Sequence, residues 1–231
     1  CSGDAVQLTA QSSVSGVTYT WDPPNSTTSI LLDSPTSSND YSVIAEDQQG
    51  CMGYDTISIL VIPPLQVDIS GNLSICEGEF TTLTATGNLA GMTFEWSDQS
   101  VLDQITVNPG STQSYSVEAS YENCPSVQDQ VEVQMNAIPT VTAPEGLEIC
   151  FGETVTVSGQ SSIAGSTIYW LPNQEQGSTY TFQPQGSEFV YLYADNNGCI
   201  SPTDSFFVEV MYGCNVEVPN VFTPNGDNSN D

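Results

Sequence analysis

Short runs of alternating apolar and polar residues fill the chain, and turn-forming residues separate them. Thr81, Leu83 and Ala85 alternate in one run, and Phe94 and Trp96 alternate in the next. A period of two places one row of side chains in a core and the other in water, as in a β-strand. No stretch keeps the period of a helix. We therefore predict an all-β fold built of small antiparallel sandwiches.

Three landmarks recur along these runs: an opening cysteine, a tryptophan and a closing cysteine. They are Cys1, Trp21 and Cys51; Cys76, Trp96 and Cys124; and Cys150, Trp170 and Cys199. The tryptophan follows its opening cysteine at an identical spacing in all three sets, and the closing cysteine follows at a nearly identical one. Such constant spacing indicates tandem repeats. We predict a first repeat at residues 1–64, a second at 65–138, a third at 139–213, and a tail at 214–231.

The repeats differ at their beginnings and agree in their expected cores. The first repeat lacks the strand that precedes the opening cysteine in the other two. The three tryptophans lie in phase with apolar neighbours, so each is expected to anchor the core of its repeat. In the third repeat the same reasoning places Phe189, Tyr191 and Tyr193 on the core face.

The charge of the chain is strongly one-sided. It has 28 acidic residues and no Lys, Arg or His, for a formal net charge of −28. The usual general bases, Schiff-base amines and anion clamps are therefore missing, so we predict that the protein is not an enzyme and has no catalytic residues. Nucleic acid and anionic membrane surfaces are repelled, whereas multivalent cations and basic protein surfaces are attracted. No apolar run is long enough to cross a membrane.

Seven cysteines favour an oxidising compartment outside the cytoplasm. A zinc site is the alternative, but it needs cysteines in close clusters, and even the nearest two, Cys199 and Cys214, are too widely spaced for that. We expect one disulfide in each repeat, between its opening and closing cysteines, stapling one end of the sandwich. The odd cysteine, Cys214, either pairs with a residue outside this sequence or is a free thiol.

The order of cysteine, tryptophan and cysteine on alternating strands resembles the immunoglobulin-like (Ig-like) fold. The Tyr-x-Val-x-Ala strands that begin at Tyr41 and Tyr115, and the Asn-Gly-Cys sequence that ends at Cys199, resemble the PKD-like and Ig-like repeats of Bacteroidota surface proteins. Antibody domains differ, because their cysteines lie within the strands. The resemblance implies a tandem array of three small Ig-like sandwiches.

The tail carries a second resemblance. Residues 218–231 read Val-Pro-Asn-Val-Phe-Thr-Pro-Asn-Gly-Asp-Asn-Ser-Asn-Asp. This is similar to the opening of the gliding-motility-associated C-terminal domain, the sorting domain of type IX secretion, with Asn228 where that pattern has Gly. The resemblance implies export to the surface of a Bacteroidota bacterium.

Acidic and hydroxyl residues supply the candidate sites. Asn225, Asp227, Ser229 and Asp231 place oxygen atoms at every second position, which suits either a calcium ion or an Asn/Asp-rich turn. Calcium is the one cofactor that the sequence suggests.

An acidic residue also follows each Cys-x-Gly, at Asp4, Glu79 and Glu153, where we expect it to cap a turn rather than bind a cation. Thr56 and Ser205 each follow an aspartate and match an O-glycosylation motif associated with Bacteroidota surface proteins.

These observations predict a non-enzymatic extracellular protein: a rod of repeats in a surface adhesin or filament. Its partners would be other protein subunits, including copies of itself, or a glycan. A strand from a neighbour, such as the segment with Val216 and Val218, could complete the first repeat by strand addition. The alternatives are a spacer between an upstream secreted enzyme and its sorting domain, and a carbohydrate-binding module, which needs exposed aromatic residues.

Overall fold

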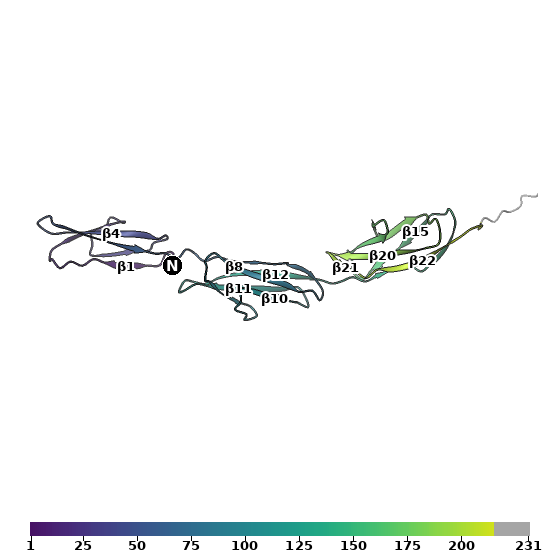
Figure 1. Ribbon diagram of the computed structural model, residues 1–231, viewed down its shortest axis with the longest axis horizontal. Coiled ribbons are helices and arrows are strands. Elements are labelled where there is room, and N and C mark those ends of the chain that lie inside the picture. The colour runs from purple at the N-terminus through teal and green to yellow at the C-terminus, as the bar shows by residue number, and fades with distance from the viewer. Residues whose placement is uncertain (215–231) are drawn as a thin grey trace, which may run out of the picture. The chain divides into compact units, whose positions relative to one another are not determined.

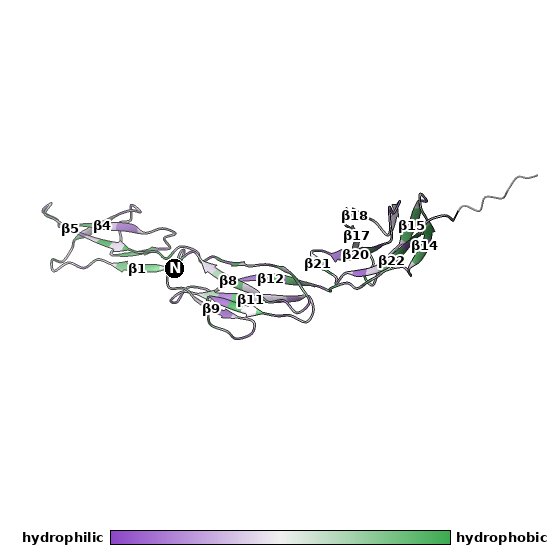
Figure 2. Ribbon diagram, turned by 45° about the vertical axis from the view of Figure 1, so that its right-hand side comes forward, coloured by the Kyte–Doolittle hydropathy of each residue, from purple (hydrophilic) through white to green (hydrophobic). Residues whose placement is uncertain are grey.

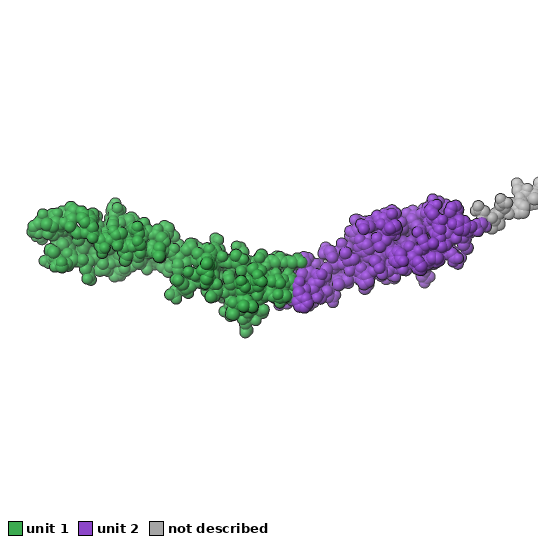
Figure 3. Space-filling view, in the orientation of Figure 1, with its two compact units in different colours: residues 1–73, 81–107, 114–133 green, residues 74–80, 108–113, 134–231 purple. Residues whose placement is uncertain are grey.

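The computed structural model describes residues 1–214, which form strands and no helix (Figure 1). The chain divides into two compact units (Figure 3). Unit 1 comprises residues 1–73, 81–107 and 114–133, and unit 2 comprises residues 74–80, 108–113 and the chain from 134 onward. All the borders between the two units fall within the second repeat. The predicted all-β class is confirmed.

The first repeat lies in unit 1 and has five strands in two sheets. They are β1 (Val6–Thr9), β2 (Thr18–Asp22), β3 (Ile30–Asp33), β4 (Asn39–Glu46) and β5 (Met52–Ile59). β1 pairs with β3, and β2, β4 and β5 form the second sheet, all antiparallel. Leu8, Trp21, Leu31 and Tyr41 are buried between the sheets.

The second repeat contributes strands to both units. They are β6 (Val67–Ser70), β7 (Ser74–Cys76), β8 (Thr81–Gly87), β9 (Thr93–Trp96), β10 (Gln104–Val107), β11 (Gln113–Ser120) and β12 (Val127–Asn136). In unit 1, β8 lies between β6 and β10, and β9 pairs with β11. In unit 2, β7 runs parallel to the last residues of β12.

The third repeat lies in unit 2. Its strands are β13 (Val141–Thr142), β14 (Leu147–Cys150), β15 (Val155–Ser158), β16 (Gln160–Ser161), β17 (Thr167–Leu171), β18 (Glu175–Gln176), β19 (Thr179–Phe182), β20 (Glu188–Asn196), β21 (Cys199–Ile200) and β22 (Asp204–Met211). The main sheet has the order β14-β22-β20-β17-β18, and β15 pairs with β19 across the core. Apolar and hydrophilic residues are mixed along the strands (Figure 2), as sandwiches with one wet face require.

The three tryptophans are buried, which confirms that they are core residues. Trp21, Trp96 and Trp170 are each at most 3% exposed. Each indole nitrogen donates a hydrogen bond to a backbone carbonyl six or seven residues later, at 2.8 to 2.9 Å. A buried indole must find an acceptor, and the turn after its own strand supplies one in every repeat.

The opening turns are also built alike. Glu79 Oε2 accepts a hydrogen bond from the backbone nitrogen of Cys76 at 2.9 Å, and the Glu79 nitrogen donates to the Cys76 carbonyl at 3.0 Å. Gly78 closes this turn at a φ of +83°, where a side chain would be strained. Asp4 and Glu153 make the equivalent contacts in the other repeats. The turn-capping prediction is confirmed.

The predicted phase of the strand near residue 190 is wrong. Val190 and Leu192 face the core, whereas Phe189 and Tyr191 are 56% and 45% exposed. Tyr193 lies on the same outer face. The strand β20 is apolar at both parities, so alternation alone could not choose its buried face.

Candidate interaction surfaces

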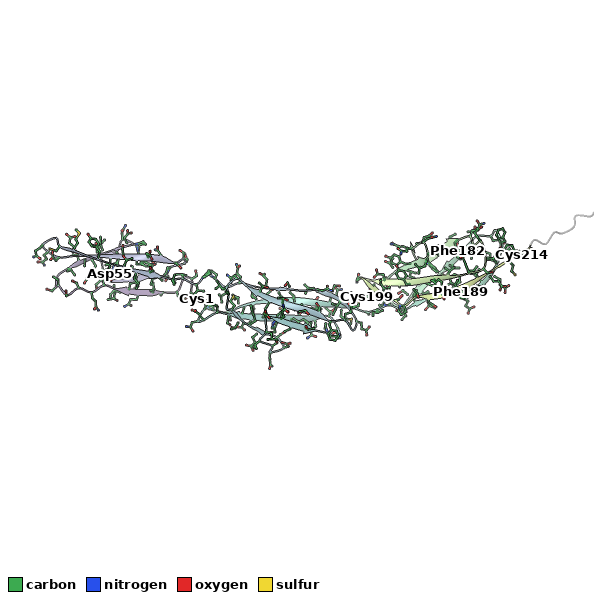
Figure 4. The ribbon with its side chains drawn as sticks, viewed as in Figure 1. Cys1, Asp55, Phe182, Phe189, Cys199 and Cys214 are labelled. Atoms are coloured by element: carbon green, nitrogen blue, oxygen red, sulfur yellow. A yellow bond between two sulfur atoms is a disulfide. The ribbon has the colours of Figure 1, made fainter. Side chains whose placement is uncertain are left out.

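The disulfides join consecutive repeats instead of closing single ones. Cys1 bonds to Cys124 and Cys76 bonds to Cys199, each across 123 residues, with Cα atoms 5.5 Å apart (Figure 4). In both bonds the opening cysteine of one repeat meets the closing cysteine of the next. This pairing corrects the expectation of one disulfide within each repeat.

The third bond joins Cys150 to Cys214, so Cys214 has its partner within the described chain and not outside it. Cys51 is exposed and is the free cysteine of residues 1–214.

Strand length explains why a repeat cannot close on itself. In the third repeat, Cys150 lies opposite Met211 at the end of β22, whereas Cys199 precedes the start of that strand. The eight residues of β22 span roughly 25 Å. A disulfide needs Cα atoms within about 7 Å, so the opening and closing cysteines of one repeat are at opposite ends of it.

Hydrogen bonds surround the bond between Cys76 and Cys199. Asn136 is buried, and its Nδ2 donates to Ser74 Oγ at 2.9 Å. Its Oδ1 accepts from Asn197 Nδ2 at 3.2 Å, and Asn196 Nδ2 donates to the Ala137 carbonyl at 2.9 Å. Side-chain amides from the third repeat therefore contact the end of the second, and the joint is built of specific contacts beyond its disulfide.

The first repeat has an open groove where the other repeats have strands. In those repeats β6 and β13 extend one sheet, while β7 and β14 add in parallel to the last strand, β12 or β22. Within residues 1–214, no strand occupies the equivalent edges beside β1 and β5. The space that remains is a groove of about 430 Å³. Its apolar lining includes Leu8, Ala10, Trp21, Tyr41, Val43 and Ile57.

The exposure of Ile57 measures what is missing. This residue is 48% exposed, whereas Phe206, two residues after the corresponding aspartate in the third repeat, is 4% exposed. Ile57 therefore presents apolar surface that the equivalent residue of the third repeat buries.

In the second and third repeats, an aspartate near the start of the last strand binds the segment that precedes the opening cysteine. Asp204 Oδ2 accepts a hydrogen bond from the backbone nitrogen of Ala143 at 2.8 Å, and its Oδ1 accepts from the nitrogen of Ser205 at 2.8 Å. These two donors stabilise the carboxylate, Ala143 more than Ser205, and hold the pKa of Asp204 below its ordinary value.

The same arrangement recurs at Asp129 and is half complete at Asp55. Asp129 Oδ2 accepts from the nitrogen of Ile69 on β6 at 2.7 Å, while its Oδ1 accepts from Gln130 at 2.8 Å. Asp55 Oδ1 likewise accepts from Thr56 at 2.8 Å. Asp55 Oδ2 has no donor within residues 1–214, and Asp55 lines the groove.

A second surface is the aromatic outer face of the third repeat. Phe189 and Phe207 have ring centroids 5.0 Å apart, and Tyr169 and Tyr193 stack at 5.0 Å. Tyr191 lies between these pairs along β20, and its ring centroid is 6.3 Å from that of Phe189. Alternation along the sequence did not reveal this face, because the predicted phase of β20 was wrong. The signal was present in the consecutive apolar residues of β20.

The remaining predicted sites are placed only in part. Thr56 is exposed and Ser205 is half-buried. The aspartate before each of them has a structural role in the hydrogen bonds described above, so it is no evidence for a glycosylation motif. Glycosylation of Thr56 and Ser205 stays a prediction. The proposed calcium ligands at 225–231 and the strand donor at 216–218 lie outside the described residues.

Residues 1–214 contain neither a metal-binding cluster nor a membrane-spanning helix. No group of three or more Cys, Asp or Glu side chains there is arranged to hold a metal ion. This part of the chain also has no helix that could cross a membrane.

Comparison by sequence finds no matching family model and no matching curated protein. Comparison by structure finds similarity to the N-terminal eight Ig domains of Down Syndrome Cell Adhesion Molecule, with a TM-score of 0.52 and 11% identity over 91% of this chain. Sidekick-1 immunoglobulin domains 1–5 match 90% of this chain at 15% identity and a TM-score of 0.42, and the insect immune protein hemolin matches 91% at 11% and 0.33.

The chain spans only 35% of the first of these structures and 57% of the second. At such identities the likeness concerns the fold alone, and only the first score is high enough to support an argument. The described chain has the fold of Ig-like domains in tandem.

Proposed function

We propose that this chain is a non-enzymatic extracellular protein with a structural or adhesive role, in which disulfides cross-link each Ig-like repeat to the next. The bonds between Cys1 and Cys124 and between Cys76 and Cys199 carry this proposal. A disulfide across the connector transmits tension from one repeat to the next without loading the connector itself. Disulfides between consecutive repeats suit a protein that bears mechanical force more than one that binds and releases a small molecule.

The absence of His, Lys and Arg from the sequence supports a role without catalysis. The carboxylates that the structure explains, at the opening turns and at Asp129 and Asp204, accept backbone hydrogen bonds. They act as structural caps. We therefore assign no catalytic residue.

Peptide mapping without reduction tests the proposed wiring. The full chain is purified under oxidising conditions, free thiols are alkylated, and protease fragments are identified by mass spectrometry. The expected fragments link Cys1 to Cys124 and Cys76 to Cys199, with Cys51 alkylated. A Cys51→Ser variant is the matched control and should give the same links. Fragments that link Cys76 to Cys124 would overturn the proposal.

The finer proposal concerns export and assembly. The resemblance of residues 218–231 to a type IX sorting domain supports export to a bacterial surface. The open groove of the first repeat supports extension of the array by strand addition, in an adhesin or filament. Intact-protein mass spectrometry of native material would detect glycosylation at Thr56 or Ser205, and a bare-chain mass would exclude it.

The aromatic face of the third repeat favours a second candidate function, binding of a glycan through stacking. Phe189 and Tyr191 are exposed side by side on β20, which is the platform that such binding requires. A glycan array probed with the full chain tests it. Binding should be lost in Tyr191→Ser and kept in Tyr54→Ser, which removes an exposed tyrosine of the first repeat. Equal binding by both variants, or no binding by the parent chain, would remove this candidate.

A further inference from the structure

We propose that the groove and Cys51 of the first repeat form a joint for one more Ig-like repeat of the same kind, placed before Cys1 in the polypeptide. The segment that joins that repeat to Cys1 would supply the strand that fills the groove, and the opening cysteine of that repeat would bond to Cys51. This inference rests on the proposed function, because it extends the same cross-repeat wiring by one step.

The equivalent cysteines of the other repeats support the assignment of Cys51. Cys124 and Cys199 occupy the closing position, and each is bonded to the opening cysteine of the repeat before it. Cys51 occupies the same position, between the last two strands of its repeat, and is exposed. Asp47 Oδ1 accepts a hydrogen bond from the Cys51 nitrogen at 2.9 Å, so the loop presents the thiol in an ordered turn.

The groove gives an independent indication. In the other repeats the strands that occupy the corresponding space, β6 and β13, are followed within a few residues by β7 and β14, which end at the opening cysteines Cys76 and Cys150. A strand that fills the groove in the same way would therefore lead, through one short further strand, to Cys1.

Two groups of the first repeat are ready to receive that strand. Asp55 Oδ2 lacks the backbone donor that Asp129 and Asp204 have from β6 and from Ala143. Ile57 lacks the cover that Phe206 has. Both groups line the same groove, so one incoming strand could serve both.

A second copy of the described chain fits this joint poorly. Its three opening cysteines, Cys1, Cys76 and Cys150, are already bonded. Its candidate donor strands, β6, β7, β13 and β14, are already paired. A further repeat brings an unpaired opening cysteine, and the segment that joins it to Cys1 brings an unpaired strand.

The bond itself forms by oxidation. The thiols of Cys51 and of the incoming cysteine lose two protons and two electrons, and the electrons reduce an external disulfide to two thiols, as a disulfide oxidant of the extracytoplasmic space would provide. The joint contains no basic side chain from this chain, so backbone pairing and apolar contact are its non-covalent attractions.

The test grafts a known repeat onto the full chain. Residues 65–149 are duplicated in front of Cys1, so that the grafted β13 and β14 precede Cys1 as they naturally precede Cys150. Cys124→Ser in the grafted copy removes the thiol that would have no partner. Peptide mapping should link the grafted Cys76 to Cys51, and titratable thiol should fall from one per chain to none.

A second measurement tests the groove without the disulfide. In a graft that also carries Cys76→Ser in the grafted copy, amide exchange at residues 9–12 should slow at least tenfold relative to the ungrafted chain. Val141→Asp in the grafted strand should abolish this protection. Unchanged exchange in both grafts would overturn the assignment of the groove.

The mapping also separates the possible failures. If the native bonds of Cys1 with Cys124 and of Cys76 with Cys199 form while Cys51 keeps its thiol, this inference is wrong and the proposed function stands. A dimer linked through Cys51 of two copies would likewise overturn the inference. Loss of the native cross-repeat bonds in the ungrafted chain would overturn the proposed function itself.

Discussion

The cross-repeat disulfides predict that the oxidised chain resists extension almost completely. When the chain is pulled at both ends, the force follows the shortest covalent path. From Cys1 this path crosses to Cys124, follows the backbone to Cys150, and crosses to Cys214. An extended residue spans at most about 3.6 Å, so the unfolded length between Cys1 and Cys214 is limited to roughly 95 Å.

Other pairings give different lengths, which makes the measurement decisive. With all bonds reduced, the whole backbone from Cys1 to Cys214 extends to roughly 770 Å. With one disulfide inside each repeat, the segments 51–76, 124–150 and 199–214 remain free, and the limit is roughly 240 Å.

Single-molecule pulling of the full chain between terminal handles can measure these lengths. The tail beyond Cys214 adds the same length in every case. We expect the short limit in oxidising buffer and the long limit after reduction, with the Cys51→Ser variant indistinguishable from the parent chain. An oxidised limit near the intermediate length would refute the reasoning, because it would show that the repeats close on themselves.

Three further predictions concern the strands. Asp204→Ala removes the acceptor for the backbone nitrogen of Ala143, a charge-assisted bond worth about 1.5 kcal/mol at a partly exposed site, so amide exchange of residues 141–150 should accelerate roughly tenfold. Asp55 Oδ2 has no such donor in residues 1–214, so Asp55→Ala should leave the amide exchange of the first repeat nearly unchanged. Equal acceleration by Asp55→Ala and Asp204→Ala would contradict the role assigned to this aspartate. Because the folded pKa of Asp204 lies below its ordinary value of 3.8, its stabilisation should be present above about pH 4 and should fade as the pH drops through the folded pKa, as acid unfolding of the parent compared with Asp204→Asn would show. Val190→Ala should lower the free energy of unfolding by about 1 to 2 kcal/mol, whereas Tyr191→Ala should change it by less than about 0.5 kcal/mol in chemical denaturation, and the reverse order would restore the phase expected from sequence.

Much of the local structure could be predicted from the sequence by itself. Alternation located the strands, constant spacing revealed the repeats, and the phase of the tryptophans placed them in the cores. The acid after each Cys-x-Gly was recognised as a turn cap. All of these features depend on neighbours within a few residues or on one strongly buried side chain, so periodicity and spacing are enough to find them.

The tertiary structure decided which distant groups meet. The sequence spacing suits a disulfide within a repeat as well as one between repeats, and only the length of β22 separates the opening cysteine from the closing one. The sequence could not decide which face of β20 is buried, because both its odd-numbered and its even-numbered residues are apolar. The role of Asp204 depends on Ala143, 61 residues away, and no local pattern reports such a contact. Pairings of this kind follow from how the strands pack in space, which local periodicity does not encode.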